Sequence, residues 1–151
     1  MTCVPFFCNL GILIKKFTTM KTKYVCSHCN QNINVGEDIV LVAKNKDGKK
    51  SLVFLHTTLG NYTSKFNPDF AIKEGDLVKF LCPICHANLT NKKHNHLADF
   101  TMIDENKKKF NIVFSQIYGE KCTYKIEEQK VVESFGKHLE RYQNPEWFLN
   151  K

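Results

Sequence analysis

Two pairs of closely spaced cysteines are the residues of this chain most able to do chemistry. The first pair is Cys26 and Cys29, and the second is Cys82 and Cys85. Two residues separate the thiols in each pair, so a tight turn can direct both toward one point. Four thiolates at about 2.3 Å satisfy a tetrahedral Zn²⁺ ion completely and leave no open coordination position. The pattern therefore predicts one structural zinc ion rather than a catalytic one.

Two other kinds of chemistry use the same residue types. A rubredoxin-like iron centre is held by four cysteines, and residue type alone does not separate iron from zinc. Thioredoxin-type redox chemistry uses Cys-x-x-Cys at the start of a helix in a βαβ unit, and no such unit surrounds Cys82. His28 lies inside the first pair and His86 follows the second. With four cysteines present, we expect both histidines to be exposed or to hydrogen-bond a thiolate.

Cys122 is the lone cysteine of the predicted folded region. The neighbouring Lys121 could lower its pKa and make it a nucleophile or redox thiol. An isolated cysteine on a strand is more often a small buried hydrophobe, so we predict no catalytic residue and no enzyme. His94 and His96 would share one face of a strand and could bind a second metal, but we expect them to be linker residues.

The composition indicates a mildly basic protein. The 151 residues carry a net charge of +7, and only Arg141 among the 22 basic residues is arginine. Unlike arginine, lysine has no planar guanidinium group that can form two parallel hydrogen bonds to guanine or phosphate. The basic clusters on predicted turns are Lys49–Lys50, Lys92–Lys93 and Lys107–Lys109. Aromatic residues in the predicted loop Thr57–Ile72 could stack on unpaired bases, although we expect them to fill the core.

Residues 1–19 differ from the rest of the chain. The stretch Cys3 to Ile14 is apolar but too short to span a bilayer. Residues 1–19 also lack the basic n-region and the Ala-x-Ala-like cleavage site of a signal peptide. We expect translation to start at Met20, with a disordered extension or a weak membrane anchor as the alternatives. The cysteine pairs indicate metal ligands in a reducing compartment, so we predict a cytoplasmic protein.

The remaining sequence predicts a mainly β fold. Residues 20–90 are expected to form a Cys₄ zinc ribbon with a large β insert between its two cysteine pairs. Residues 91–151 are expected to form a C-terminal antiparallel β meander packed on the ribbon, followed by a short terminal helix. The sequence shows no long helical stripe and no evident repeat. The expected strands are Glu37 to Lys44, Ser51 to His56, Leu77 to Leu81, Leu97 to Ile103, Phe110 to Ile117, Cys122 to Ile126 and Val131 to Phe135.

The four cysteines and their strand-like flanks resemble zinc ribbons and related Cys₄ β-folds, including small uncharacterised bacterial zinc-ribbon proteins. The 52 residues between Cys29 and Cys82 are similar in number to those of the Yippee-like, β-tent group, which includes methionine-R-sulfoxide reductases. The Gly-Trp-x-Tyr stretch of Yippee-like proteins is absent after Cys85, and the reductase signature Arg-x-Cys-x-Asn does not surround Cys122. The resemblance therefore implies a fold and no catalysis.

We predict a non-catalytic protein with one structural zinc ion that acts as a macromolecular interaction module. Its partner would be a protein or RNA/DNA, with no small-molecule substrate and no membrane. The alternative is a thiol-dependent redox enzyme, or a redox or zinc sensor, that uses Cys122 or the Cys-x-x-Cys pairs.

Overall fold

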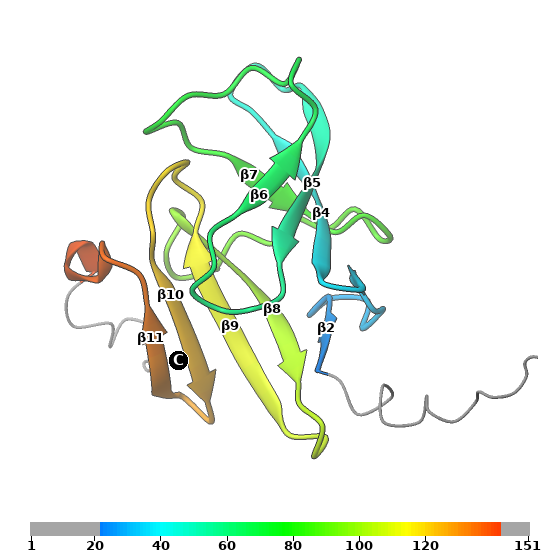
Figure 1. Cartoon of the computed structure of the whole chain (residues 1–151), viewed down its shortest axis with the longest axis vertical. Coiled ribbons are helices and arrows are strands. Elements are labelled where there is room, and N and C mark those ends of the chain that lie inside the picture. The colour runs from blue at the N-terminus through cyan, green and yellow to red at the C-terminus, as the bar shows by residue number, and fades with distance from the viewer. Residues whose placement is uncertain (1–21, 143–151) are drawn as a thin grey trace, which may run out of the picture.

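The computed structural model describes residues 22–142, which form a mainly β fold of two antiparallel sheets (Figure 1). This confirms the predicted fold class. The predicted terminal helix is a single 3₁₀ turn within the described residues, η1 (Leu139–Tyr142). Residues 1–19 and the aromatic end of the chain, Trp147 and Phe148, lie outside the described residues. Within residues 22–142, no helix has the length and apolar character that crossing a membrane requires.

Each sheet contains five strands. The N-terminal sheet has the order β3-β4-β5-β6, with β7 paired to β4, and the C-terminal sheet has the order β11-β10-β9-β8-β2. The strands are β2 (Lys23–Val25), β3 (Asn34–Val35), β4 (Asp38–Lys44), β5 (Lys50–His56), β6 (Ser64–Phe66), β7 (Lys79–Leu81), β8 (Leu97–Ile103), β9 (Lys109–Ser115), β10 (Thr123–Glu127) and β11 (Lys130–Phe135). All seven expected strands are present, with ends within two residues of those expected, whereas β6 lies inside the segment Thr57–Ile72 that was expected to be a loop.

The segments around the two cysteine pairs have the same pattern of backbone hydrogen bonds. Val25 forms an isolated bridge with Asn32, and Leu81 forms the equivalent bridge with Asn88. The N–H of the residue after each asparagine then donates to the strand before the cysteines: Ile33 to the Tyr24 carbonyl and Leu89 to the Phe80 carbonyl, both at 2.8 Å. The two cysteine turns are therefore copies of one local structure.

The similarity between the two halves extends through the hairpins β4–β5 and β8–β9. Asn45 closes the turn between β4 and β5 by accepting the N–H groups of Asp47 and Lys49. Asp104 closes the turn between β8 and β9 in the same way, by accepting those of Asn106 and Lys108. β6 then pairs with β5 as β10 pairs with β9, in the matching register. The described part of the chain thus contains two structural repeats, contrary to our reading of the sequence.

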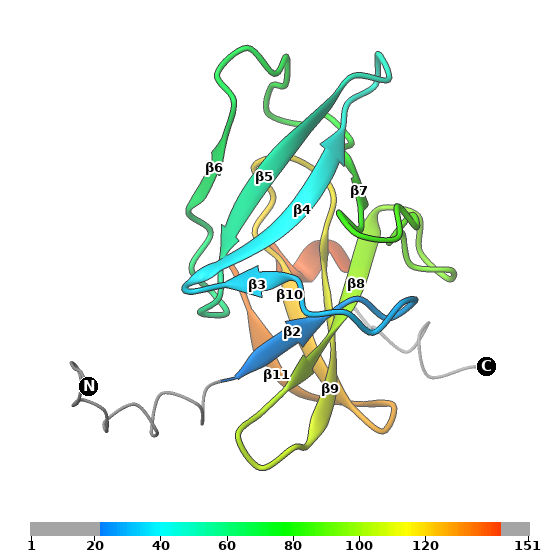
Figure 2. The same ribbon diagram turned by 90° about the vertical axis from the view of Figure 1, so that its right-hand side faces the viewer.

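The repeats exchange one strand each. β2 belongs to the first repeat but pairs with β8 of the second, and β7 belongs to the second repeat but pairs with β4 of the first. Figures 1 and 2 show β2 lying beside β8, at the edge of the sheet built by the second repeat. Because the exchange is reciprocal, the two halves have a twofold topological relation, and neither sheet is complete without the other half.

The main core lies between the two sheets. The inward side chains of β4, including Ile39 and Leu41, pack with Phe100 and Ile112 from β8 and β9. The period-two alternation of strands places the neighbouring side chains on the outer faces. A second, smaller cluster covers the outer face of the C-terminal sheet, where Tyr142 and Leu139 of η1 pack on it. The outer face of the N-terminal sheet has no such cover within the described residues.

Candidate metal centre

The two cysteine turns bring the four predicted ligands together. Cys26 Sγ lies 3.8 Å from Cys85 Sγ, and Cys29 Sγ lies 3.8 Å from Cys82 Sγ. All four sulfur atoms fall within 4.8 Å of one another, an arrangement that could hold a metal ion. Each of these two distances joins the first cysteine of one repeat to the second cysteine of the other, so the centre lies where the repeats meet.

The local backbone explains why each cysteine pair turns tightly. Asn30 and His86, the residues directly after the second cysteines, have φ angles of 62° and 66°. This left-handed conformation is uncommon outside glycine, and asparagine and histidine adopt it more readily than most residues. It lets the N–H of Asn30 bond to the Cys26 carbonyl at 2.9 Å and the N–H of His86 bond to the Cys82 carbonyl at 3.0 Å.

Backbone N–H groups also point at the first sulfur of each pair. The N–H groups of His28 and Cys29 donate to Cys26 Sγ at 3.2 and 3.5 Å. Those of Ile84 and Cys85 donate to Cys82 Sγ at 3.3 and 3.4 Å. Such bonds stabilise a thiolate, and four thiolates around one divalent ion leave a net negative charge that needs this compensation.

Burial differs between the four ligands. Cys26 and Cys82 are fully buried, Cys29 is half-buried and Cys85 is exposed. Burial raises the pKa of the Cys26 thiol to about 12, and the positive charge of a bound metal ion would favour its thiolate form. The donor set of four sulfurs, two of them out of water, therefore fits a thiophilic metal ion.

The histidines do not join this centre. Among residues 22–142, the four cysteines are the group of potential metal ligands that lies close enough to hold an ion. His28 and His86 are exposed on the turns, as expected. His94 and His96 lie with ring centroids 5.6 Å apart, and His94 also packs against Tyr142 at 5.1 Å.

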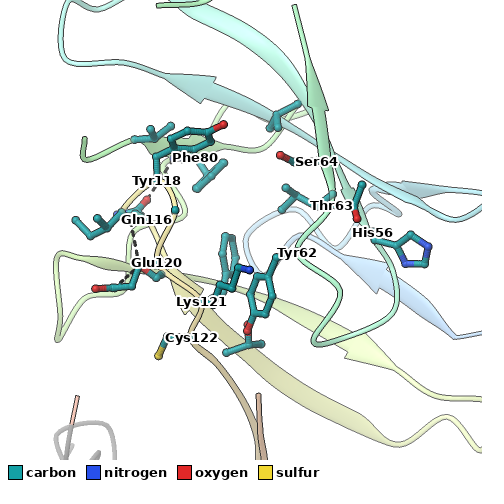
Figure 3. A pocket seen from close by; sticks show the side chains of 18 of the residues that line it. His56, Tyr62, Thr63, Ser64, Phe80, Gln116, Tyr118, Glu120, Lys121 and Cys122 are labelled. Atoms are coloured by element: carbon teal, nitrogen blue, oxygen red, sulfur yellow. Dashed lines mark hydrogen bonds between the residues drawn. The ribbon is translucent and has the colours of Figure 1, made fainter. Parts of the chain in front are cut away.

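Cys122 lies in an environment that suppresses thiolate chemistry. The residue is fully buried in the cluster under η1, and burial raises the pKa of its thiol to about 11. Figure 3 shows its sulfur pointing away from the labelled side chains of the neighbouring pocket. Reactive cysteines are partly exposed and have lowered pKa values, which is the opposite combination.

The loop aromatics and the lysine turn have structural partners. Phe70 is buried and Phe66 packs against the main core. The Tyr62 hydroxyl lies 2.8 Å from Thr123 Oγ1 and donates to the Phe135 carbonyl at 3.1 Å. Lys108, in the turn between β8 and β9, pairs with Glu127 at 3.0 Å. These aromatic side chains therefore contact other residues of the protein, as expected for side chains that fill the core.

Sequence reasoning missed a row of lysines on the outer face of the N-terminal sheet. Lys44 lies opposite Lys50 on β5 and opposite Lys79 on β7, so three ammonium groups cross three adjacent strands. All three are exposed, and within residues 22–142 none has a carboxylate partner. Only the pairing of β7 with β4 completes the row, and nothing in the sequence indicates that pairing.

In comparisons with known proteins, no family model, no curated protein and no solved structure matches this chain.

Proposed function

We propose that this protein binds one structural zinc ion and acts as a non-catalytic module that docks a protein partner on the outer face of its N-terminal sheet. The zinc ion would fix the two cysteine turns, and the docking face would consist of the lysine row Lys79–Lys44–Lys50 and the apolar rows beside it.

The sulfur geometry supports zinc. Four ligands at about 2.3 Å in a tetrahedron lie about 3.8 Å apart, and the sulfur pairs Cys26–Cys85 and Cys29–Cys82 are each separated by 3.8 Å. Four thiolates close the coordination shell, so the ion would have no position for a substrate. This supports a structural and non-catalytic role for the metal.

The single observation that carries the interaction role is the uncompensated lysine row. Like charges directly opposite one another on neighbouring strands destabilise a sheet, yet Lys79, Lys44 and Lys50 lie in register. An anionic partner would offset this repulsion. The next row across the same strands is apolar, Leu81–Val42–Leu52, and Leu52 is 52% exposed.

The aliphatic row favours an acidic protein over a nucleic acid. Leucine and valine cannot stack on bases, whereas they pack well against apolar side chains of a protein segment. The repeat provides a parallel, because Leu139 and Tyr142 of the chain's own η1 cover the equivalent outer face of the C-terminal sheet. A partner segment with apolar and acidic residues would cover the N-terminal sheet in the same way.

The test compares two probes on the zinc-loaded full chain. A peptide array that combines leucine with aspartate or glutamate represents the acidic protein, and an oligo(dT) strand represents nucleic acid. We expect array peptides to bind, and their binding to be lost in Lys44→Glu and in Leu52→Ser. The matched control is Lys109→Glu, which changes an exposed lysine on the other sheet and should leave binding unchanged.

Two outcomes would contradict this function. The first is binding of oligo(dT) without binding of any acidic peptide, which would assign the lysines to nucleic acid. The second is an equal loss of peptide binding in Lys44→Glu and Lys109→Glu, which would mean that binding depends only on the net charge of the protein. The rival redox function has less support, because Cys122 is fully buried and the pKa of its thiol is raised to about 11.

A further inference from the structure

A cavity of about 290 Å³ lies between the two sheets, on the opposite side of the N-terminal sheet from the lysine row. Equivalent loops of the two repeats form its rim, residues 58–63 from the first and 117–122 from the second. Gly60 and Gly119 occupy matching positions in these loops, with φ angles of 91° and 89°. Ligand sites commonly form where two structural units meet, and this cavity lies at such an interface (Figure 3).

Two chains of aromatic rings form part of the walls of the cavity. In the first, Phe66 contacts Phe70 and Tyr118, each with ring centroids 6.0 Å apart and nearly perpendicular planes. In the second, Phe114 contacts Phe80 at 5.4 Å and Phe100 at 5.2 Å in tilted arrangements. All six rings line the same cavity. Such walls offer both faces and edges to a further aromatic ring.

The apolar lining is open to solvent. Six side chains that pack against the main core remain only half-buried, and each of them lines the cavity. These residues are Leu55, Leu59, Phe66, Ile72, Phe80 and Phe114. Core residues normally lose their water contact on folding, so a guest that covers these side chains would gain the remaining hydrophobic free energy.

Two polar side chains of the cavity lining, Gln116 and Glu120, already have hydrogen-bond partners. Gln116 accepts from the Phe80 N–H at 3.3 Å and donates to the Asn95 carbonyl at 3.2 Å. The Glu120 carboxylate accepts from Ser115, Tyr142 and Arg141. Lys121 and Glu74 also line the cavity, and no ion pair involves either side chain among the described residues. Because these two charges have opposite signs and cancel, the lining has no excess charge that would compensate a buried ionic guest.

The size of the cavity limits the guest. An apolar protein cavity of about 150 Å³ suffices to bind benzene, and this one is about 290 Å³. One aromatic ring with a small substituent, or two fused rings, would fill it.

We propose that this cavity binds a neutral aromatic small molecule of one or two rings, stacked between the walls of the two repeats. The inference is independent of the protein-docking function proposed above, because it concerns the opposite face of the N-terminal sheet. The sequence did not predict this ligand, since the rings come from both repeats and only the fold assembles them.

The test titrates the zinc-loaded full chain with three ring compounds of similar size and follows backbone amide chemical shifts. Benzyl alcohol is neutral and aromatic, cyclohexylmethanol is neutral and saturated, and benzoate is aromatic and charged. We expect benzyl alcohol to bind at one site and about tenfold more tightly than either comparison compound. Cyclohexylmethanol lacks the contacts between aromatic rings, and benzoate would bury a charge that the lining does not compensate. The shifted amides should lie in residues 58–63 and 117–122.

A pair of variants links binding to the cavity. Leu55→Trp fills the cavity and should abolish binding. The control is Val132→Trp, at a 45% exposed position of β11 outside the cavity lining, and it should bind as the wild type does. Leu59→Trp, in the rim loop, replaces Leu55→Trp if that variant loses its zinc. Unsaturable binding of benzyl alcohol, equal affinity for all three compounds, or undiminished binding in the cavity-filling variant would each overturn the proposal.

Discussion

At the residue scale, the cysteine spacing was sufficient to predict the four potential metal ligands. Two residues between the sulfurs of each pair require a turn, and the structure forms that turn with left-handed residues at Asn30 and His86. The N–H groups that point at Cys26 and Cys82 could not be predicted, because backbone donors leave no trace in residue types. The lone Cys122 was correctly expected to be a buried hydrophobe.

Replacing single cysteines should distinguish those that bind the metal from those that do not. Cys82→Ser removes one of two fully buried sulfurs of the centre, so we expect loss of bound metal and of the folded state, because metal binding and folding are coupled in such sites. Cys122→Ala should keep its metal and lose only about 1 kcal/mol, the cost of a small buried cavity. Metal content and urea unfolding measure both effects. Unchanged metal content in Cys82→Ser would contradict the ligand assignment.

The buried thiol of Cys122 should not react with alkylating reagents in the folded protein. Because the pKa of Cys122 is raised to about 11, its thiolate is scarce at neutral pH, and burial also blocks access of reagents. We expect iodoacetamide at pH 7.5 to leave Cys122 unmodified in the zinc-loaded protein and to alkylate it after unfolding in urea. Peptide mass spectrometry reads the modified position. Rapid alkylation in the folded protein would instead support the redox alternative.

At the element scale, the hairpins could be predicted and their partners could not. The sequence Asp47-Gly48 marks the turn between β4 and β5, and Gly48 adopts a φ of 82° there. β6 was missed because it has only three residues and is held by pairing with β5 rather than by its own apolar pattern. The exchange of β2 and β7 between sheets depends on contacts between distant segments, which local patterns do not encode.

The attachment of η1 should depend on one carboxylate. Glu120, whose side chain is 6% exposed, accepts bonds from Ser115 and Tyr142 and pairs with Arg141 at 3.0 Å. Glu120→Ala leaves these donors unpaired and should cost about 2 kcal/mol of unfolding free energy at pH 7. Glu140→Ala, which changes an exposed residue of η1, is the control and should cost under about 0.5 kcal/mol.

The pH dependence of this effect has a fixed sign. Burial opposes ionisation of Glu120, but the bonds from Ser115, Tyr142 and Arg141 hold its pKa below the ordinary value of 4.5. A lowered pKa in the folded state gives stability that is present above the unfolded pKa and is lost as the pH falls through the folded pKa. The difference between wild type and Glu120→Ala should therefore be constant at neutral pH and shrink below about pH 4.5. A difference that grows on acidification would contradict the network.

At the scale of the whole molecule, the candidate metal centre lies where two structural repeats exchange strands. Each sheet contains a strand of the other repeat, and each exchanged strand leads directly into a cysteine turn. The repeat was missed in the sequence because only a few residues match, such as the paired cysteines and Asn32 with Asn88. Its consequence is that the metal would connect both sheets rather than stabilise one ribbon.

Metal removal should therefore act on the entire fold. If zinc held only the first cysteine turn in place, a chelator would release β2 and leave the C-terminal hairpins intact. Because both turns supply ligands, we expect one cooperative loss of protected amides in both sheets. Hydrogen exchange with and without chelator measures this, and persistent protection of β8, β9 and β10 after complete metal removal would show that the C-terminal sheet is independent.

The most direct test of the account is the metal content of the natively purified full chain, measured together with its β circular dichroism before and after chelation. The account predicts one zinc ion per chain and loss of the β signal when that zinc is removed. A chain that contains no metal, or iron in place of zinc, or that keeps its full β signal without metal, would contradict a structural zinc centre that joins the two repeats.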